Sequence, residues 1–323
     1  MKKSNYQAPL IPSAFIWRKL HSFTGLWLVL FLIEHLLTNS QAALLIGDNG
    51  NGFVRGVNFL RNLPYLPVIE IFLLGVPFLI HGIWGIKYLM TSQSNSFPSD
   101  GSTPSLTEYP RNHAYTWQRI TSWILLFGII AHVVHMRFIE YPNSAQKGTQ
   151  IDYMVPIMED RGLATLSKRI NFNILDSQQI DSFKNPNETM INLSETPKEN
   201  LSAEQLITLQ SNKEEQNWIK ALKKRPLQEG QVMAVTPDFG VAELLMVRDT
   251  FKSPLMIFLY TVLVLTACYH GFNGLWTFMI GWGITLTARS QQLMRTFATG
   301  LMILITFLGL AAIWGTYWIN LTY

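Results

Sequence analysis

The sequence contains only one cysteine, Cys268, among its 323 residues. A lone cysteine excludes a disulfide framework within the chain and any zinc or iron–sulfur site built on several thiolates. Charge is also scarce, because 14% of the residues are charged while 48% are hydrophobic and 12% are aromatic. This balance excludes an ordinary soluble domain and indicates a protein with several membrane spans. The net charge of +4 is too small to indicate a nucleic-acid-binding protein.

The N-terminal segment lacks the pattern of a cleavable signal. Its residues, M-K-K-S-N-Y-Q-A-P-L-I-P, contain no apolar core followed by a small-residue cleavage site. We therefore expect the first apolar segment to be retained as a membrane span.

Five apolar segments are long enough to cross a bilayer, which takes about 20 helical residues. They cover residues 20–39, 66–91, 117–139, 254–279 and 295–319. An odd number of spans puts the two termini on opposite sides of the membrane. On one side lie nine basic residues, namely Lys2, Lys3, Arg18, Lys19, Lys87, Arg111, Arg119, Arg289 and Arg295. The short segments on the other side carry three, namely Arg55, Arg61 and Arg137. The positive-inside rule thus predicts a cytoplasmic N-terminus and a C-terminus outside.

Residues 140–252 differ from the rest of the chain, because they hold 16 of the 21 acidic and 13 of the 25 basic residues. The stretches S-A-E-Q-L-I-T-L-Q and N-K-E-E-Q-N-W-I-K-A-L-K-K are typical of helices. No metal-ligand spacing, phosphate-binding loop or nucleophile motif occurs there. We predict an all-α membrane protein in three parts. Residues 1–139 form helices one to three, 140–252 form an outer-side insertion of unknown fold, and 253–323 form helices four and five.

Four of the seven histidines lie deep within four different spans. At 1.5 Å per helical residue, His35 and His132 lie roughly 24 and 20 Å from the cytoplasmic ends of their spans. By the same measure, His81 and His270 lie roughly 21 and 24 Å from the outer ends of theirs. Depth therefore sorts the four into an outer pair, His35 with His132, and an inner pair, His81 with His270. Ionisable groups at such depth are expected to face the interior of a bundle and to have partners.

Two pairs of imidazoles at two depths are what two haems, stacked across a membrane, require. A neutral imidazole donates a nitrogen lone pair to iron, and one on each face gives a six-coordinate electron-transfer haem. Small residues beside the histidines leave room for a flat porphyrin. They are Gly82, Gly85, Gly271 and Gly274 near the inner pair, and Gly128 and Ala131 near His132. Two alternatives stay open: a transporter whose histidines relay protons, and a purely structural anchor without a cofactor.

Basic residues near the span ends are candidate partners of the anionic haem propionates. Arg18, Arg119 and Arg289 are placed for the inner haem, and Arg61 and Arg137 for the outer one. Anchoring at the membrane surface accounts equally well for the same arginines.

The remaining ionisable groups are weaker candidates. Glu70, near the outer end of the second span, is a candidate for exchanging protons with a quinol, whereas Glu34 is expected to orient a polar neighbour such as His35. His21 lies at the cytoplasmic edge, where it is expected to snorkel or to contact a propionate or quinone. His135 lies one turn beyond His132 and is an alternative ligand. His113 falls in a loop.

Segments in all five spans resemble those of a known family. They are F-I-W-R-K-L-H-S-F-T-G with I-E-H-L-L, E-I-F-L-L-G-V-P-F-L-I-H-G-I-W-G, W-Q-R-I-T with I-I-A-H, and H-G-F-N-G-L-W-T-F with W-G-I-T-L-T-A-R-S-Q. About 200 residues resemble the di-haem cytochrome b subunit of succinate dehydrogenase and fumarate reductase, of the succinate:menaquinone type. The match is most specific from His270 to Gln291.

The resemblance implies that the four axial ligands are His35, His81, His132 and His270. It also implies the pairing that depth gives, with His81 and His270 at the proximal haem b and His35 and His132 at the distal one. The implied cofactors are two haem b groups, with a quinone, preferably menaquinone, as substrate.

The implied role is that of the membrane subunit of complex II, a tricarboxylic acid cycle enzyme, in the inner membrane of a bacterium. The partners are then a flavoprotein and an iron–sulfur subunit on the cytoplasmic face. They oxidise succinate and pass electrons to this chain, which performs no dicarboxylate chemistry itself. Other quinone-linked cytochrome b anchors are an alternative of the same type.

The sequence departs from the family in two places. The insertion of about 110 residues is far longer than the usual connection, so nothing about it follows from the resemblance. Some relatives carry a glutamate two residues before the fourth ligand, as part of a proton path. Cys268 occupies that position here, which puts such a path in doubt.

Overall fold

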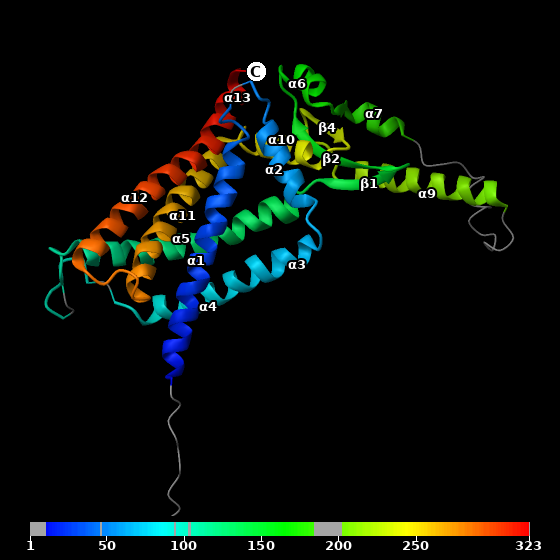
Figure 1. Ribbon diagram of the computed structural model, residues 1–323. Coiled ribbons are helices and arrows are strands. Elements are labelled where there is room, and N and C mark those ends of the chain that lie inside the picture. Colours follow the sequence, from blue (N-terminus) through cyan, green and yellow to red (C-terminus); the bar gives the residue numbers. More distant parts are fainter. Residues whose placement is uncertain (1–10, 46, 94, 103–104, 184–201, 323) are drawn as a thin grey trace, which may run out of the picture. The chain divides into compact units, whose positions relative to one another are not determined.

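A computed structural model describes residues 11–45, 47–93, 95–102, 105–183 and 202–322. In these ranges, five helical segments are long and apolar enough to cross a membrane, namely Ser13–Ser40, Leu66–Thr91, Pro110–Ile139, Pro254–Gly281 and Ala288–Thr322. Their parts are labelled α1 (Ser13–Ser40), α3 (Leu66–Glu70), η1 (Ile71–Gly75), α4 (Val76–Thr91), α5 (Pro110–Val133), η2 (Val134–Ile139), α11 (Pro254–Gly281), α12 (Ala288–Leu310), η4 (Ala311–Gly315) and α13 (Thr316–Thr322) (Figure 1). The prediction of an all-α membrane protein with five spans is confirmed. Lys2 and Lys3, which contributed to the predicted orientation, lie outside the described residues.

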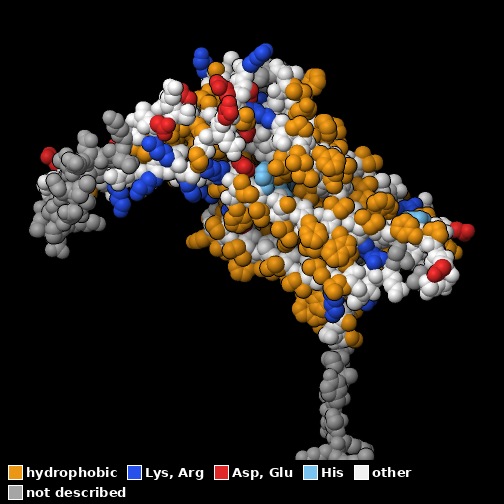
Figure 2. Space-filling model, turned by 180° about the vertical axis from the view of Figure 1, so that it is seen from behind, with side chains coloured by type: hydrophobic (Ala, Val, Ile, Leu, Met, Phe, Trp, Pro, Cys, Tyr) orange, Lys and Arg blue, Asp and Glu red, His pale blue; other side chains and the backbone are white. Residues whose placement is uncertain are grey.

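The spans present many of their apolar side chains outward. Phe72, Phe127 and Ile303, from three different spans, are each more than half exposed. Figure 2 shows hydrophobic side chains spread widely over the surface of the helices. Such a surface is stable where lipid covers it, because a helix satisfies its own backbone polar groups and needs no water.

The chain divides into two compact units. The first comprises Met1–Leu37, Pro64–Ala131 and Leu259–Leu310, and the second comprises Thr38–Leu63, His132–Phe258 and Ala311–Tyr323. The first unit therefore contains most of the length of the five spans. The second contains the whole stretch 140–252, together with α2 (Asn51–Arg61) and the remaining span ends.

Close helix approach in the first unit depends on glycine. A side chain carbon at Gly309 of α12 would lie 2.6 Å from Cγ1 of Val264 in α11 and 3.2 Å from Cδ1 of Leu36 in α1. At Gly128 of α5 it would lie 2.9 Å from Cδ1 of Leu263 in α11. Small residues at these crossings let the backbones approach, which is how helices associate where lipid removes the hydrophobic driving force.

The second span contains a π-helical turn, η1, directly after Glu70. A π turn disturbs the regular i to i−4 hydrogen bonding and leaves backbone carbonyls in need of other donors. The indole Nε1 of Trp27 in α1 donates to the carbonyl oxygen of Leu73 in η1 at 2.6 Å. This bond joins the first two spans and holds the irregular turn in place.

The second unit is built on a four-stranded antiparallel sheet in the order β1-β2-β4-β3. The strands are β1 (Asn143–Lys147), β2 (Gln150–Met158), β3 (Asn173–Leu175) and β4 (Gln231–Thr236), and the helices beside them are α6 (Leu163–Ile170), α7 (Ser177–Ser182), α9 (Ala203–Lys223) and α10 (Phe239–Thr250). One core cluster consists of Met154, Ile180, Trp218, Ile219, Leu222, Met233 and Val235. Helix α9 confirms the helical stretches expected from the sequence, whereas the sheet was not predicted.

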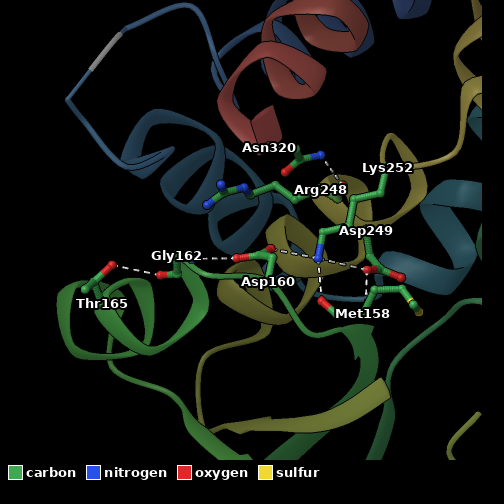
Figure 3. A network of polar contacts seen from close by, with 8 residues as sticks. All are labelled: Met158, Asp160, Gly162, Thr165, Arg248, Asp249, Lys252 and Asn320. Carbon is green, nitrogen blue, oxygen red and sulfur yellow. Dashed lines mark hydrogen bonds and ion pairs between the residues drawn. The ribbon is translucent and has the colours of Figure 1, made fainter. Parts of the chain in front are cut away.

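A polar network holds the end of α10 close to the end of β2 and to α13 (Figure 3). The Lys252 ammonium lies 2.9 Å from Oδ2 of Asp160 and 3.4 Å from Oδ1 of Asp249. The backbone N–H of Met158 donates to the same Asp249 oxygen at 2.8 Å, and the Asn320 side chain donates to the carbonyl oxygen of Arg248 at 2.7 Å. These bonds fix the chain shortly before α11 begins.

Candidate functional site

Two of the four span histidines, His81 and His270, lie close together in the first unit. Their ring centres are 6.2 Å apart and their planes are at 85°. Two imidazoles that bond one metal ion at about 2 Å each have ring centres roughly 6 Å apart. The spacing of α4 and α11 therefore suits a single iron between the two rings.

The ring of His81 is held by a backbone carbonyl. Its Nδ1 lies 3.0 Å from the carbonyl oxygen of His21 in α1. A carbonyl oxygen only accepts hydrogen bonds, so the proton of a neutral His81 resides on Nδ1. The lone pair of Nε2 is then available to a metal, and the hydrogen bond fixes the orientation of the ring.

The ring of His270 is held in the same way by two hydroxyl groups of α5. Its Nδ1 lies 3.4 Å from both Thr121 Oγ1 and Ser122 Oγ. These hydroxyls donate their own protons to backbone carbonyls, those of Trp117 and Gln118. Their oxygens therefore accept from Nδ1–H of His270, which again leaves Nε2 with a free lone pair. In both histidines, then, Nδ1 is engaged and Nε2 is the nitrogen with a free lone pair.

A chain of side-chain amides fixes the backbone beside His270. Gln118 Nε2 donates to the carbonyl oxygen of His270 at 3.0 Å, and Asn273 Nδ2 donates to Gln118 Oε1 at 2.6 Å. The indole Nε1 of Trp276 then donates to Asn273 Oδ1 at 2.8 Å. The network joins α5 to α11, so the position of His270 does not depend on its own side chain alone.

One turn of α1 forms the wall beside His81. The ring of His21 stacks on that of His81, with centres 4.1 Å apart and planes at 11°. A side chain carbon at Gly25 would lie 2.8 Å from Cε1 of His81, closer than such atoms come. Glycine is therefore needed there for the imidazole to keep its place. The sequence indicated His21 as a snorkelling residue and gave no sign of this stacking, because the contact depends on the rotation of α1 against α4.

The predicted outer pair is divided between the units. His35 lies in the first unit, where its ring is 5.3 Å from that of Phe31. His132 lies in the second unit, near the end of α5, and His135 follows in η2. The pairing of His35 with His132 therefore stays a prediction from their depths in the sequence.

The predicted polar partners occupy different settings. Arg119 donates from Nη2 to the carbonyl oxygen of Ser92 at 2.8 Å, while its Nε is buried without a hydrogen-bond partner among the described residues. Arg18 is exposed. Glu70 ends α3, directly before the π turn of η1. A buried guanidinium nitrogen without a partner is the kind of donor that an anionic group at this site would satisfy.

The donor set restricts the kind of metal site. Among the described residues, no group of three or more His, Cys, Asp or Glu side chains is placed to hold a metal ion. A haem iron needs only two protein ligands, since the porphyrin supplies four. The pair formed by His81 and His270 fits that requirement.

The fold and the site together define a helical, multi-span membrane protein in which the imidazoles of two spans lie close together. The chain is similar to the succinate dehydrogenase cytochrome b558 subunit of Bacillus subtilis (strain 168). The two are 23% identical over 300 residues, which cover 93% of this chain and 95% of that protein. No protein-family profile matches the chain, and no solved structure matches it significantly.

Proposed function

We propose that this chain is the cytochrome b membrane subunit of a succinate:quinone oxidoreductase. The observation that carries the proposal is the His81–His270 pair, with ring centres 6.2 Å apart and both Nδ1 atoms engaged. The similarity to a cytochrome b558 subunit along nearly the whole of both chains supports it independently. A proton-relay transporter is the alternative, and it predicts a purified chain without a haem spectrum.

In this proposal His81 and His270 hold one haem b through their Nε2 atoms. A haem held there would supply reversible one-electron transfer. Thr121, Ser122 and the carbonyl of His21 keep the two imidazoles in one orientation, and Arg119 offers its buried Nε to a propionate. The protein thus supplies ligand geometry and charge compensation.

The second half of the proposal concerns the other pair. We assign His35 and His132 to a second haem b, nearer the outer surface, and Glu70 to proton exchange with a quinone, preferably menaquinone. The flavoprotein and iron–sulfur subunits bind on the cytoplasmic side and deliver electrons from succinate. Electrons then pass along the chain from the inner pair to the outer pair. The depths of the histidines in their spans support this order.

Deleting the two soluble subunits in the native host tests the assignment. We expect the chain to remain in the membrane with its haem spectrum, while succinate-driven quinone reduction falls to background. Restoring the two subunits on a plasmid should restore the activity. Succinate oxidation by this chain alone, or the absence of any haem spectrum, would refute the proposal.

A further inference from the structure

A pocket in the first unit is lined by none of the four span histidines, although Asn273 and Trp276, which help to fix the backbone beside His270, are part of its lining. It has a volume of about 140 Å³ and is lined by residues of α5, α11 and α12. A cavity of about 150 Å³ holds a molecule the size of benzene, so this pocket takes a phosphate-sized group or a short length of acyl chain. Ala114, Ala298 and Thr299 are part of the lining, and their small side chains leave the space open.

The polar part of the lining is basic. Arg111 and Arg295 both line the pocket, and none of its lining residues is acidic. Arg111 donates from Nη2 to Gln291 Oε1 at 2.5 Å, which places its guanidinium at the pocket and leaves further N–H donors. Arg295 is exposed and makes no hydrogen bond or ion pair within the described part of the chain. The pocket therefore offers two positive charges without a counter-ion.

The lining residues are basic near the helix ends and uncharged deeper in the spans. Arg111 is the second residue of α5, and Arg295 lies within the first ten residues of α12, so the charges gather near helix ends. Tyr269 and Met302 also line the pocket, roughly 18 Å before the end of α11 and roughly 21 Å beyond the start of α12. At those depths a span lies within hydrocarbon. The pocket thus joins a cationic mouth to an apolar interior.

We propose that this pocket binds part of an anionic phospholipid, namely its phosphate group and a short stretch of one acyl chain. Two guanidinium groups match a phosphate by charge-assisted hydrogen bonds. Basic pockets between membrane helices are suited to anionic headgroups. The apolar depth favours a lipid over free phosphate, since phosphate alone leaves that part of the pocket empty. The lack of acidic lining residues disfavours a zwitterionic lipid, whose cationic group finds no partner there.

Native mass spectrometry of the full chain in detergent tests the proposal. The protein is incubated with phosphatidylglycerol, with phosphatidylcholine of the same acyl chains, or with phosphatidylglycerol plus millimolar inorganic phosphate. We expect retention of phosphatidylglycerol over phosphatidylcholine and no displacement by phosphate. Equal retention of the two lipids, or displacement by phosphate, would overturn the proposal.

Variants locate the site. Arg111→Gln and Arg295→Gln should each weaken phosphatidylglycerol retention about fivefold, the effect of one basic residue near an anionic lipid. Arg289→Gln is the matched control, because Arg289 lies at the start of the same helix but does not line the pocket. An equal loss in Arg289→Gln would mean general surface attraction and would refute the site.

A third variant separates lipid from haem as the occupant. Thr299 lines the pocket and is exposed, so a phenylalanine there can fill the pocket while both arginines remain. Thr299→Phe should therefore lower retention of phosphatidylglycerol without changing the haem spectrum. If Arg111→Gln or Arg295→Gln removed haem absorption while lipid retention was unchanged, the arginines would serve propionates, and the lipid proposal would be wrong.

Discussion

The imidazole rings of His81 and His270 lie 6.2 Å apart, centre to centre, with their planes at 85°. Each ring has its Nδ1 next to an acceptor, the His21 carbonyl for one and two α5 hydroxyls for the other. A simple packing contact between two histidines requires neither the same tautomer in both rings nor a ring spacing of this size. Both follow if the two Nε2 atoms bond one iron.

The first prediction concerns this pair. His81→Leu and His270→Leu should remove the same redox transition and about half of the haem, because an iron with one axial ligand loses its six-coordinate site. Redox titration of purified protein, followed by absorption, measures the effect. His113→Leu is the control, since His113 lies exposed in the first turn of α5, and not in the loop expected from the sequence, and bonds the carbonyl oxygen of Thr107 just before that helix. Loss of different transitions in His81→Leu and His270→Leu would show that the pair does not share a haem.

A second prediction concerns Gly25. Gly25→Ala places a methyl group 2.8 Å from Cε1 of His81, so the imidazole must move. We expect lower occupancy or a shifted potential of the same haem, with a destabilisation of about 1–3 kcal/mol from overpacking. Gly300→Ala is a matched change in the interior of α12, where the space is open, and it should leave the haem unchanged. Identical haem properties in Gly25→Ala and the wild type would refute the role given to this glycine.

A third prediction concerns the outer pair. His35→Leu and His132→Leu should both remove the second transition while succinate still reduces the haem held by His81 and His270. His135 lies three residues beyond His132 and is an alternative ligand, so the double variant His132→Leu/His135→Leu belongs in the same titration. If His35→Leu and His270→Leu lose the same transition, the assignment by depth is wrong.

A fourth prediction concerns Glu243 of α10, in the second unit. Its Oε1 is buried and has no hydrogen-bond partner among the described residues. Burial raises the pKa of this carboxyl from 4.5 to about 7, although Arg137 and Arg61 act in the opposite direction. The folded state therefore binds the proton more tightly than the unfolded state. Its contribution to stability is complete below pH 4.5 and is lost as the pH rises to about 7.

Glu243→Gln should abolish this pH dependence. Thermal unfolding at pH 5 and at pH 8 measures it. The wild type should lose on the order of 3 kcal/mol relative to the variant between these values. Glu229→Gln, at an exposed position, should follow the wild type. The same change with pH in the wild type and in Glu243→Gln would contradict the prediction.

The spans could be predicted from sequence because each is a local apolar run. The predicted segment 66–91 coincides with the observed Leu66–Thr91, and the others differ only at their ends. The sheet could not be predicted in this way, because β2 pairs with β4 from a distant part of the chain. Pro156 lies within β2 and makes the strand harder to recognise in the sequence, because proline has no backbone N–H to donate to a neighbouring strand.

The same distinction applies to the site. Depth along a helix is local information, and depth alone is enough to select His81 and His270 as partners. The roles of Thr121, Ser122 and Gly25 depend on how α5 and α1 are rotated towards those rings. No periodicity within a single helix reports that rotation, so these neighbours could be found only in three dimensions.

We propose that four histidines on four spans hold two b-type haems. A pyridine haemochrome assay on the purified full-length chain, with protein determined by amino-acid analysis, measures the ratio directly. We expect two haem b per polypeptide, falling to one when His81 and His270 are both replaced by leucine. One haem or none in the wild-type chain would contradict it.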